Sequence, residues 1–272
     1  MSVKTSLFSS FSNLSNEHFI LNENDYSSID QSYKVSNTSK IENFPNDINI
    51  FTIIHSIHSA FKQIHSTPSD SFHLISKSLK DLRILLKYQR RIFILVFNTI
   101  IDYFASILFI GTPSYNEAIL SPALDLTSEL FMSYHHESIY SEWIPLLLSK
   151  LFLLSVNNTD YSIKINKVID YFIQYCYEID EVGEILIEFI EDEDIDVAKK
   201  AGEVLGKLIK GGEEKRKGIN FSKILETIGN VLDYNYEEYV KIALNVVEDI
   251  KKHVSSEELT YWDIDKEDLF SY

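Results

Sequence analysis

The sequence predicts an all-α protein built as a stack of helical hairpins. Hydrophobic residues make up 45% of the 272 residues, whereas turn-forming residues are few, with 8 glycines and 5 prolines. This composition favours long helices over a sandwich of short strands. From residue 178 to residue 253, apolar residues recur at spacings of three and four, which marks one buried face on each of four successive helices.

The spacing of these helices predicts how they stack. The first pair breaks at the acidic run 191–194 and ends at Gly211-Gly212, and the second pair breaks at 233–235. The pairs follow each other after about 41 residues, a period typical of HEAT repeats. We therefore expect residues 47–254 to form an α-solenoid of about five HEAT-type hairpins, an armadillo-like superhelix.

Earlier in the chain, each expected helix has its own start or stop signal. Pro122 follows Ser121 as in a helix start, because proline in the first turn lacks only an amide that would be unpaired anyway. Pro145 is expected in the first turn of its helix, and Asp160 is expected to cap the next one, whose apolar stripe includes Ile163. The expected helices run from 47 to a break at 66–71, from there to about 88, over 92–110, from 121, over about 138–155, and from 160.

The two ends of the chain differ from this middle. Residues 1–46 are rich in serine and asparagine without a sustained period, and we expect a disordered arm. Residues 255–272 alternate acids with aromatic residues and are expected to form a tail. The tail is either a docking segment for a partner or a cover for the last repeat. Its many acids favour docking, with Trp262 as an anchor.

Charge and cysteine content limit the class of protein. The net charge of -16 argues against binding to nucleic acid or to an anionic membrane. The single cysteine fits a reducing compartment, and no secretory signal is visible, so a cytoplasmic location is expected. The apolar run 92–110 carries Asp102 near its centre, which costs roughly 2.5–3.5 kcal/mol in a membrane span. A buried helix explains it better.

No residue set in the sequence argues for catalysis. His55, His58 and His65 share one flank of a helix without an accompanying carboxylate, so they do not indicate a zinc site. Cys176 has no basic neighbour that would lower its pKa. We expect no catalytic residue, no cofactor and no metal, and hence a non-enzymatic protein that binds another protein.

Four stretches in order carry a resemblance to a known family. They are SKSLKDLRILLKYQ, SPALDLTSELF, IPLLLSKLFLLSVNNTDYSIKINKVIDYFIQYC and VGEILIEFIEDEDIDVAKKAGEVLGKL, within residues 76–208. Together they resemble the tubulin-binding TOG domain, the HEAT-repeat module of crescerin- and CLASP-type microtubule proteins. The resemblance implies a cytoskeletal adaptor that binds tubulin through the turns within its hairpins, where the family carries tryptophan and basic residues.

The chain departs from the family at that edge. The corresponding turns contain no tryptophan, arginine or lysine, and only Lys164, Lys199 and Lys200, one turn into the following helices, could reach it. An acidic edge would repel acidic tubulin. A general scaffold or assembly chaperone unrelated to tubulin is therefore the alternative.

The opposite edge, formed by the turns between hairpins, is basic. Cations at the ends of helices also complement the helix dipole, so each residue has a purely structural explanation as well. The oligomeric state is not predicted. The candidate partner-binding residues at this edge are Arg90, Arg91, Lys210, Lys215, Arg216 and Lys217.

Overall fold

The computed structural model describes residues 50–63, 68–108, 116–133, 139–157, 160–175, 182–216, 219–233, 236–262 and 264. All regular structure within these residues is helical, which confirms the predicted fold class. Ten of the helices have nine residues or more, and they follow one another as five hairpins. The expected arm over residues 1–46 and the end of the tail from residue 265 lie outside the described residues.

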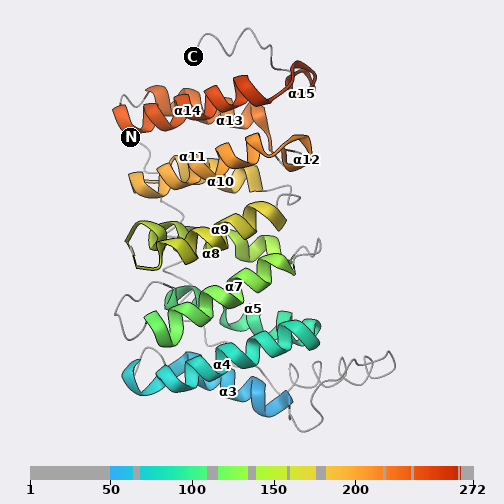
Figure 1. Cartoon of the computed structure of the whole chain (residues 1–272), viewed down its shortest axis with the longest axis vertical. Coiled ribbons are helices and arrows are strands. Elements are labelled where there is room, and N and C mark those ends of the chain that lie inside the picture. The colour runs from blue at the N-terminus through green and yellow to red at the C-terminus, as the bar shows by residue number, and fades with distance from the viewer. Residues whose placement is uncertain are drawn as a thin grey trace, which may run out of the picture.

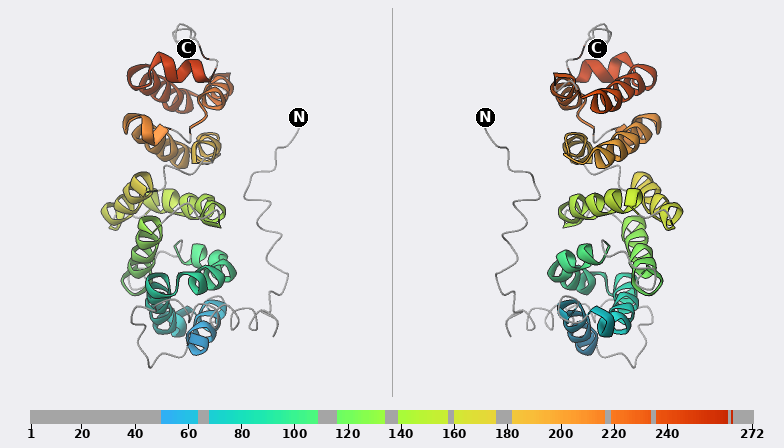
Figure 2. Two further views of the ribbon diagram at one scale, coloured as in Figure 1. Left: turned by 90° about the vertical axis from the view of Figure 1, so that its right-hand side faces the viewer. Right: turned by 90° about the vertical axis from the view of Figure 1, so that its left-hand side faces the viewer.

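The hairpins form two layers, seen as two columns in Figure 2 and as a single vertical stack in Figure 1. We call the first helix of each hairpin an A helix and the second a B helix. Neighbouring B helices contact each other along the whole stack, and so do most neighbouring A helices. The A helices are α3 (Ile50–Gln63), α5 (Arg90–Ile107), α8 (Ile139–Asn157), α10 (Val182–Ile190) and α13 (Phe221–Asp233); the B helices are α4 (Pro68–Tyr88), α7 (Ser121–Met132), α9 (Ser162–Tyr175), α11 (Ile195–Lys210) and α14 (Glu237–His253).

One continuous core lies between the layers, and aromatic residues join neighbouring A helices. Phe97 of α5 meets Trp143 of α8 edge to face, with ring centroids 4.8 Å apart. Trp143 Nε1 donates a hydrogen bond to Asn98 Oδ1 at 3.2 Å. Asn98, a polar residue within the apolar run 92–110, thus accepts the hydrogen bond that the buried indole of Trp143 donates. No helix of the described residues is long and apolar enough to cross a membrane.

The predicted start at Ser121-Pro122 is confirmed, whereas two other prolines differ from the expectation. α4 begins at Pro68, inside the expected break, because proline fits the first turn, where its missing amide is not needed. A π-helical segment, η1 (Asn116–Leu120), leads directly into α7, so helical winding starts before Ser121. Pro145 lies in the second turn of α8 rather than the first.

The expected cap and one expected core residue of α9 are also corrected. The helix begins at Ser162, and the carbonyl of Tyr161 accepts the amide of Ile165, so Asp160 lies too early to cap it. Ile163 was placed in the apolar stripe but is 86% exposed. At 100° per residue it lies about 200° from Ile165 around the helix and therefore faces away from the core.

Two B helices approach closely enough to require glycine. A Cβ atom on Gly202 of α11 would lie 2.7 Å from Ile242 Cγ2 of α14. Such a contact is too short to be tolerated without movement. The last two B helices are therefore packed more tightly than an alanine at this position allows.

Candidate protein-interaction surfaces

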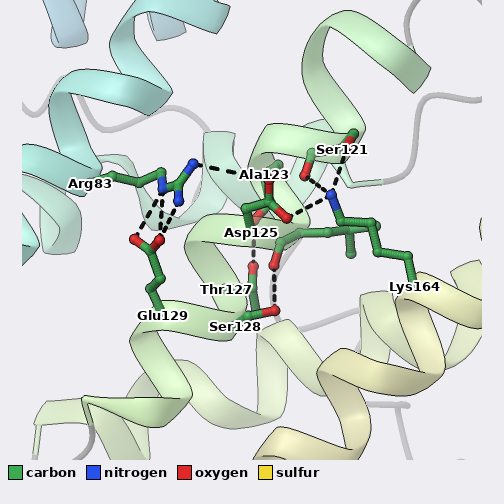
Figure 3. A network of polar contacts seen from close by, with 9 residues as sticks. Arg83, Ser121, Ala123, Asp125, Thr127, Ser128, Glu129 and Lys164 are labelled. Carbon is green, nitrogen blue, oxygen red and sulfur yellow. Dashed lines mark hydrogen bonds and ion pairs between the residues drawn. The ribbon is translucent and has the colours of Figure 1, made fainter.

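A network of ion pairs joins α4, α7 and α9 on the outer face of the B layer. Figure 3 shows Arg83 reaching in from α4 and Lys164 from α9, on either side of the carboxylates of α7. Arg83 Nε donates to both carboxylate oxygens of Glu129 at 3.0 Å. Lys164 Nζ lies 2.6 Å from Asp125 Oδ1 and donates to the carbonyl oxygen of Ser121 at 2.9 Å.

The network results from the local sequence of α7. Asp125 and Glu129 are four residues apart and therefore occupy one face of the helix. The hydrogen bond to Glu129 raises the pKa of Arg83. Because Arg83 is 38% exposed, solvent screens this pair and its effect on stability is small. Its main consequence is geometric, since both carboxylates and both cations are held in place.

A groove of about 600 Å³ runs along this network between α7 and α9. We call it the α7/α9 groove. Its walls mix the paired charges with apolar side chains, of which Met132 and Ile163 are exposed. Lys167 lies over the ring of Tyr171, with its Nζ 5.7 Å from the centroid. The groove is lined by Arg83, Asp125, Ser128, Glu129, Met132, Asp160, Tyr161, Ile163, Lys164, Lys167 and Tyr171.

Among these lining residues, only Lys164 was predicted from the sequence to meet a partner, whereas Asp160 and Ile163 were expected as a helix cap and a buried residue. A groove between two parallel helices depends on which residues face each other, and the spacing along each helix does not determine that. Two local signals were present. Asp125 and Glu129 form a charged pair on one face, and Ile163 is out of phase with the stripe Ile165, Val168 and Ile169.

The three cations expected at the tubulin-type edge all form ion pairs within the chain. Lys164 contacts Asp125 at 2.6 Å. Lys199 Nζ lies 3.5 Å from Glu238, and Lys200 Nζ lies 3.1 Å from Glu203. A partner at this edge would compete with these carboxylates.

The turn at this edge between α10 and α11 consists of four consecutive acids, 191–194. The amide of Asp196 donates to Asp194 Oδ1 at 3.0 Å, so Asp194 caps α11. Tyr239 Oη donates to the main-chain oxygen of Asp192 at 2.6 Å. Burial raises the pKa of the Asp192 carboxyl, with neighbouring acids adding to the effect. The turn is therefore ordered by its own hydrogen bonds.

At the opposite edge, the expected basic residues do not form one exposed cluster. Arg90 donates to the main-chain oxygen of Ser133, and Lys210 Nζ lies 2.8 Å from Asp249 Oδ2. Arg91 is exposed and Lys215 is half-buried. Lys217 lies outside the described residues.

Arg216 is buried and holds the C-terminal end of the chain in place. It lies in the short helix α12 (Glu213–Arg216) and reaches α15 (Ser256–Tyr261), 42 residues away. Its Nε and Nη2 donate to the two carboxylate oxygens of Glu258 at 2.8 and 3.0 Å, and its Nη1 donates to the Ile209 carbonyl at 2.8 Å. We call this set of contacts the Arg216–Glu258 latch. The side chain expected to meet a partner is thus used within the fold.

Residues 255–262 and 264 pack on the last repeat beyond the expected boundary at 254. Ser255 and Glu258 form a capping box at the start of α15, and Leu259 is fully buried. Trp262 is half-buried against the core, and its carbonyl accepts a hydrogen bond from Ser222 Oγ at 2.7 Å. These contacts are those of a cover for the terminal repeat.

The described residues contain no group of three histidine, cysteine, aspartate or glutamate side chains placed to hold a metal ion. The described surface has paired charges, exposed aliphatic side chains and a groove between two helices. Such features suit the binding of another chain.

Comparison with known proteins finds similarity only among solved structures. No protein-family model matches the sequence, and no curated protein matches it. Similar solved structures include an engineered protein of the Northeast Structural Genomics Consortium, with 16% identity and a TM-score of 0.33 over 80% of this chain and 82% of that one. A designed armadillo repeat protein has 12% identity and a TM-score of 0.31, covering 78% of this chain and 87% of its own.

A third structure is described as computationally designed armadillo repeat proteins for modular peptide recognition. It has 13% identity and a TM-score of 0.32, and it covers 79% of this chain and 87% of its own. The described helices themselves define an all-α helical-repeat solenoid, and the TOG resemblance stays a prediction.

Proposed function

We propose that this solenoid is a non-enzymatic scaffold that binds an extended segment of another protein in the α7/α9 groove. The observation that carries the proposal is the exposed aliphatic surface in that groove. Ile163 is 86% exposed, and Met132 lies on the facing wall. Burying such a side chain contributes roughly 1.5–3 kcal/mol, which favours a bound partner.

The walls of the groove are prepared for binding. Arg83 is held by hydrogen bonds from its Nε to both carboxylate oxygens of Glu129, and Lys164 is held by Asp125 and Ser121. Side chains that are already ordered lose little conformational entropy when a partner binds. The groove therefore combines a fixed polar frame with accessible apolar contacts, an arrangement found in protein interfaces.

Tubulin remains the specific partner that the family resemblance suggests. Binding through the usual edge would require Lys164, Lys199 and Lys200 to leave their carboxylates. It would also bring the acids 191–194 toward an acidic partner. Both considerations favour the general scaffold over a tubulin-binding module, and with it a cytoplasmic rather than a cytoskeletal location.

Selection from a phage-displayed library of random 12-residue peptides tests the proposal. Peptides enriched on the full chain are labelled and titrated by fluorescence anisotropy. We expect the double variant Met132→Ser, Ile163→Ser to weaken binding at least tenfold. Leu95→Ser is the matched control, because Leu95 is an exposed aliphatic residue on the A helix α5.

Equal loss in the control, or no loss in the groove variant, contradicts the proposal. Co-sedimentation of the full chain with microtubules tests the tubulin alternative in parallel. Binding that is lost when Lys164, Lys199 and Lys200 are changed to Glu, but kept in the groove variant, would replace the groove by the usual edge.

A further inference from the structure

We propose that the α7/α9 groove selects an acidic segment, in which a carboxylate binds Lys167 while a neighbouring aliphatic side chain packs against Ile163. This inference rests on the proposed function, because it names the chemistry of the segment that the groove takes. It follows from how the charges that line the groove are already used.

Four of the six charges in the groove neutralise each other. Arg83 pairs with Glu129, and Lys164 pairs with Asp125. Arg83 Nη1 also lies 4.0 Å from Asp125. A basic partner could reach these carboxylates only by displacing Arg83 or Lys164, and an acidic partner could reach these cations only by displacing Glu129 or Asp125. The paired network therefore favours neither sign of charge, and the two remaining charges decide the preference.

The two remaining charges, Asp160 and Lys167, are not equivalent. Neither has an ion pair within the part of the chain that the structure describes. Asp160 lies just before the first residue of α9, where the positive end of the helix dipole stabilises a carboxylate. Lys167 lies in the middle of α9, where neither helix end offsets its charge. Lys167 is therefore the lining charge that is most readily available to a carboxylate of a partner.

Lys167 is also placed at the apolar part of the groove. It lies one turn after Ile163 and one turn before Tyr171 on the same face of α9. Its Nζ is over the Tyr171 ring at 5.7 Å, which orients the ammonium group across the helix surface. A bound carboxylate at Lys167 would thus have its neighbouring side chain against Ile163. This pattern defines an acidic residue beside a large aliphatic one.

The net charge of the whole protein favours basic partners, which is the opposite of the preference proposed for the groove. At a net charge of -16, long-range attraction favours basic segments over acidic ones. Selection in 0.15 M salt reduces that long-range term, because the screening length falls to about 8 Å, and leaves the contact at Lys167 largely intact. An acidic consensus from an acidic protein is therefore a specific result of the groove.

The test sequences the peptides that the full chain enriches from the random 12-residue library at this salt concentration. We expect Asp or Glu next to Leu, Ile or Met. Lys167→Gln should raise the Kd of an enriched peptide about three- to tenfold, the effect of losing one charge-assisted hydrogen bond. Lys207→Gln is the matched control, because Lys207 is an exposed lysine of α11 that already pairs with Asp170 at 2.7 Å.

The outcomes separate this inference from the proposed function. Peptides that depend on Met132 and Ile163 but carry Lys or Arg, or that ignore Lys167→Gln, overturn the acidic preference and keep the groove. Peptides that are indifferent to Met132 and Ile163, or no enrichment at all, overturn both. An equal effect of Lys207→Gln shows a general charge effect and also overturns the role of Lys167.

Discussion

The Arg216–Glu258 latch gives the sharpest prediction about stability. The side chains of Arg216 and Glu258 are 8% and 20% exposed, and Arg216 also satisfies the Ile209 carbonyl. Arg216→Met keeps most of the volume but leaves the Glu258 carboxylate without its cation, with only its hydrogen bonds from Ser255, and leaves the Ile209 carbonyl without the Arg216 donor. Removing one partner of a buried pair costs roughly 3–5 kcal/mol. Because Glu258 keeps some contact with water, we expect a loss of about 2–4 kcal/mol.

This loss should appear first as local detachment of α15 and Trp262, because the contacts of a repeat protein are mainly between neighbours. Replacing Trp143 by Phe leaves Trp262 as the sole tryptophan of the 2 in the chain. In that background, we expect Arg216→Met to shift the Trp262 emission toward that of a hydrated indole. Urea unfolding followed by circular dichroism measures the accompanying loss of stability.

The latch also predicts a pH dependence. The hydrogen bond from Arg216 lowers the pKa of Glu258 below its usual value of 4.5. A carboxyl group with a lowered pKa in the folded state contributes stability above the unfolded pKa, and that contribution is lost as the pH falls through the folded pKa. The urea midpoint followed by Trp262 emission should therefore fall as the pH drops below about 4.5 in the parent protein, and it should change less in Arg216→Met, where only Ser255 still lowers the pKa of Glu258.

Lys252→Gln is the control for a surface ion pair. Lys252 and Glu248 are both well exposed, and we expect little change when that pair is removed. If Arg216→Met leaves both unfolding and Trp262 emission unchanged, the Arg216–Glu258 latch does not hold α15 on the last repeat. The same conclusion holds if Trp262 of the parent protein already emits as a fully hydrated indole.

Two further changes test the packing of the stack. Gly202→Ala should destabilise the protein by about 1–3 kcal/mol, because the new Cβ would overpack against Ile242. Gly229→Ala should stabilise the protein by about 0.5–1 kcal/mol, because this helical position has open space around it. Urea unfolding of both variants checks the opposite signs, and equal effects would contradict the close approach of α11 and α14. Arg83→Met should cost only about 0.5–1 kcal/mol in the same assay, because its pair with Glu129 is part-exposed; a larger loss would mean that the pair holds the stack together rather than shaping the groove.

Helix content and the order of the hairpins were determined by the sequence itself. A helix forms from contacts three and four residues apart, so its apolar stripe can be recognised without knowledge of what covers it. The acidic run 191–194 and Gly211-Gly212 mark their helix ends for the same local reason. The α-solenoid followed from the repetition of this local pattern.

The sites were decided by the tertiary structure, because each depends on which residue of one helix faces which residue of another. Arg216 appeared in the sequence as one cation of an exposed cluster, but its partner Glu258 is 42 residues away. Lys164 appeared as a contact for a partner, yet the register between α7 and α9 places it on Asp125. The same register brings exposed side chains of both helices, among them Met132 and Ile163, into the lining of one groove. Periodicity shows that a helix has two faces, and only packing shows what each face meets.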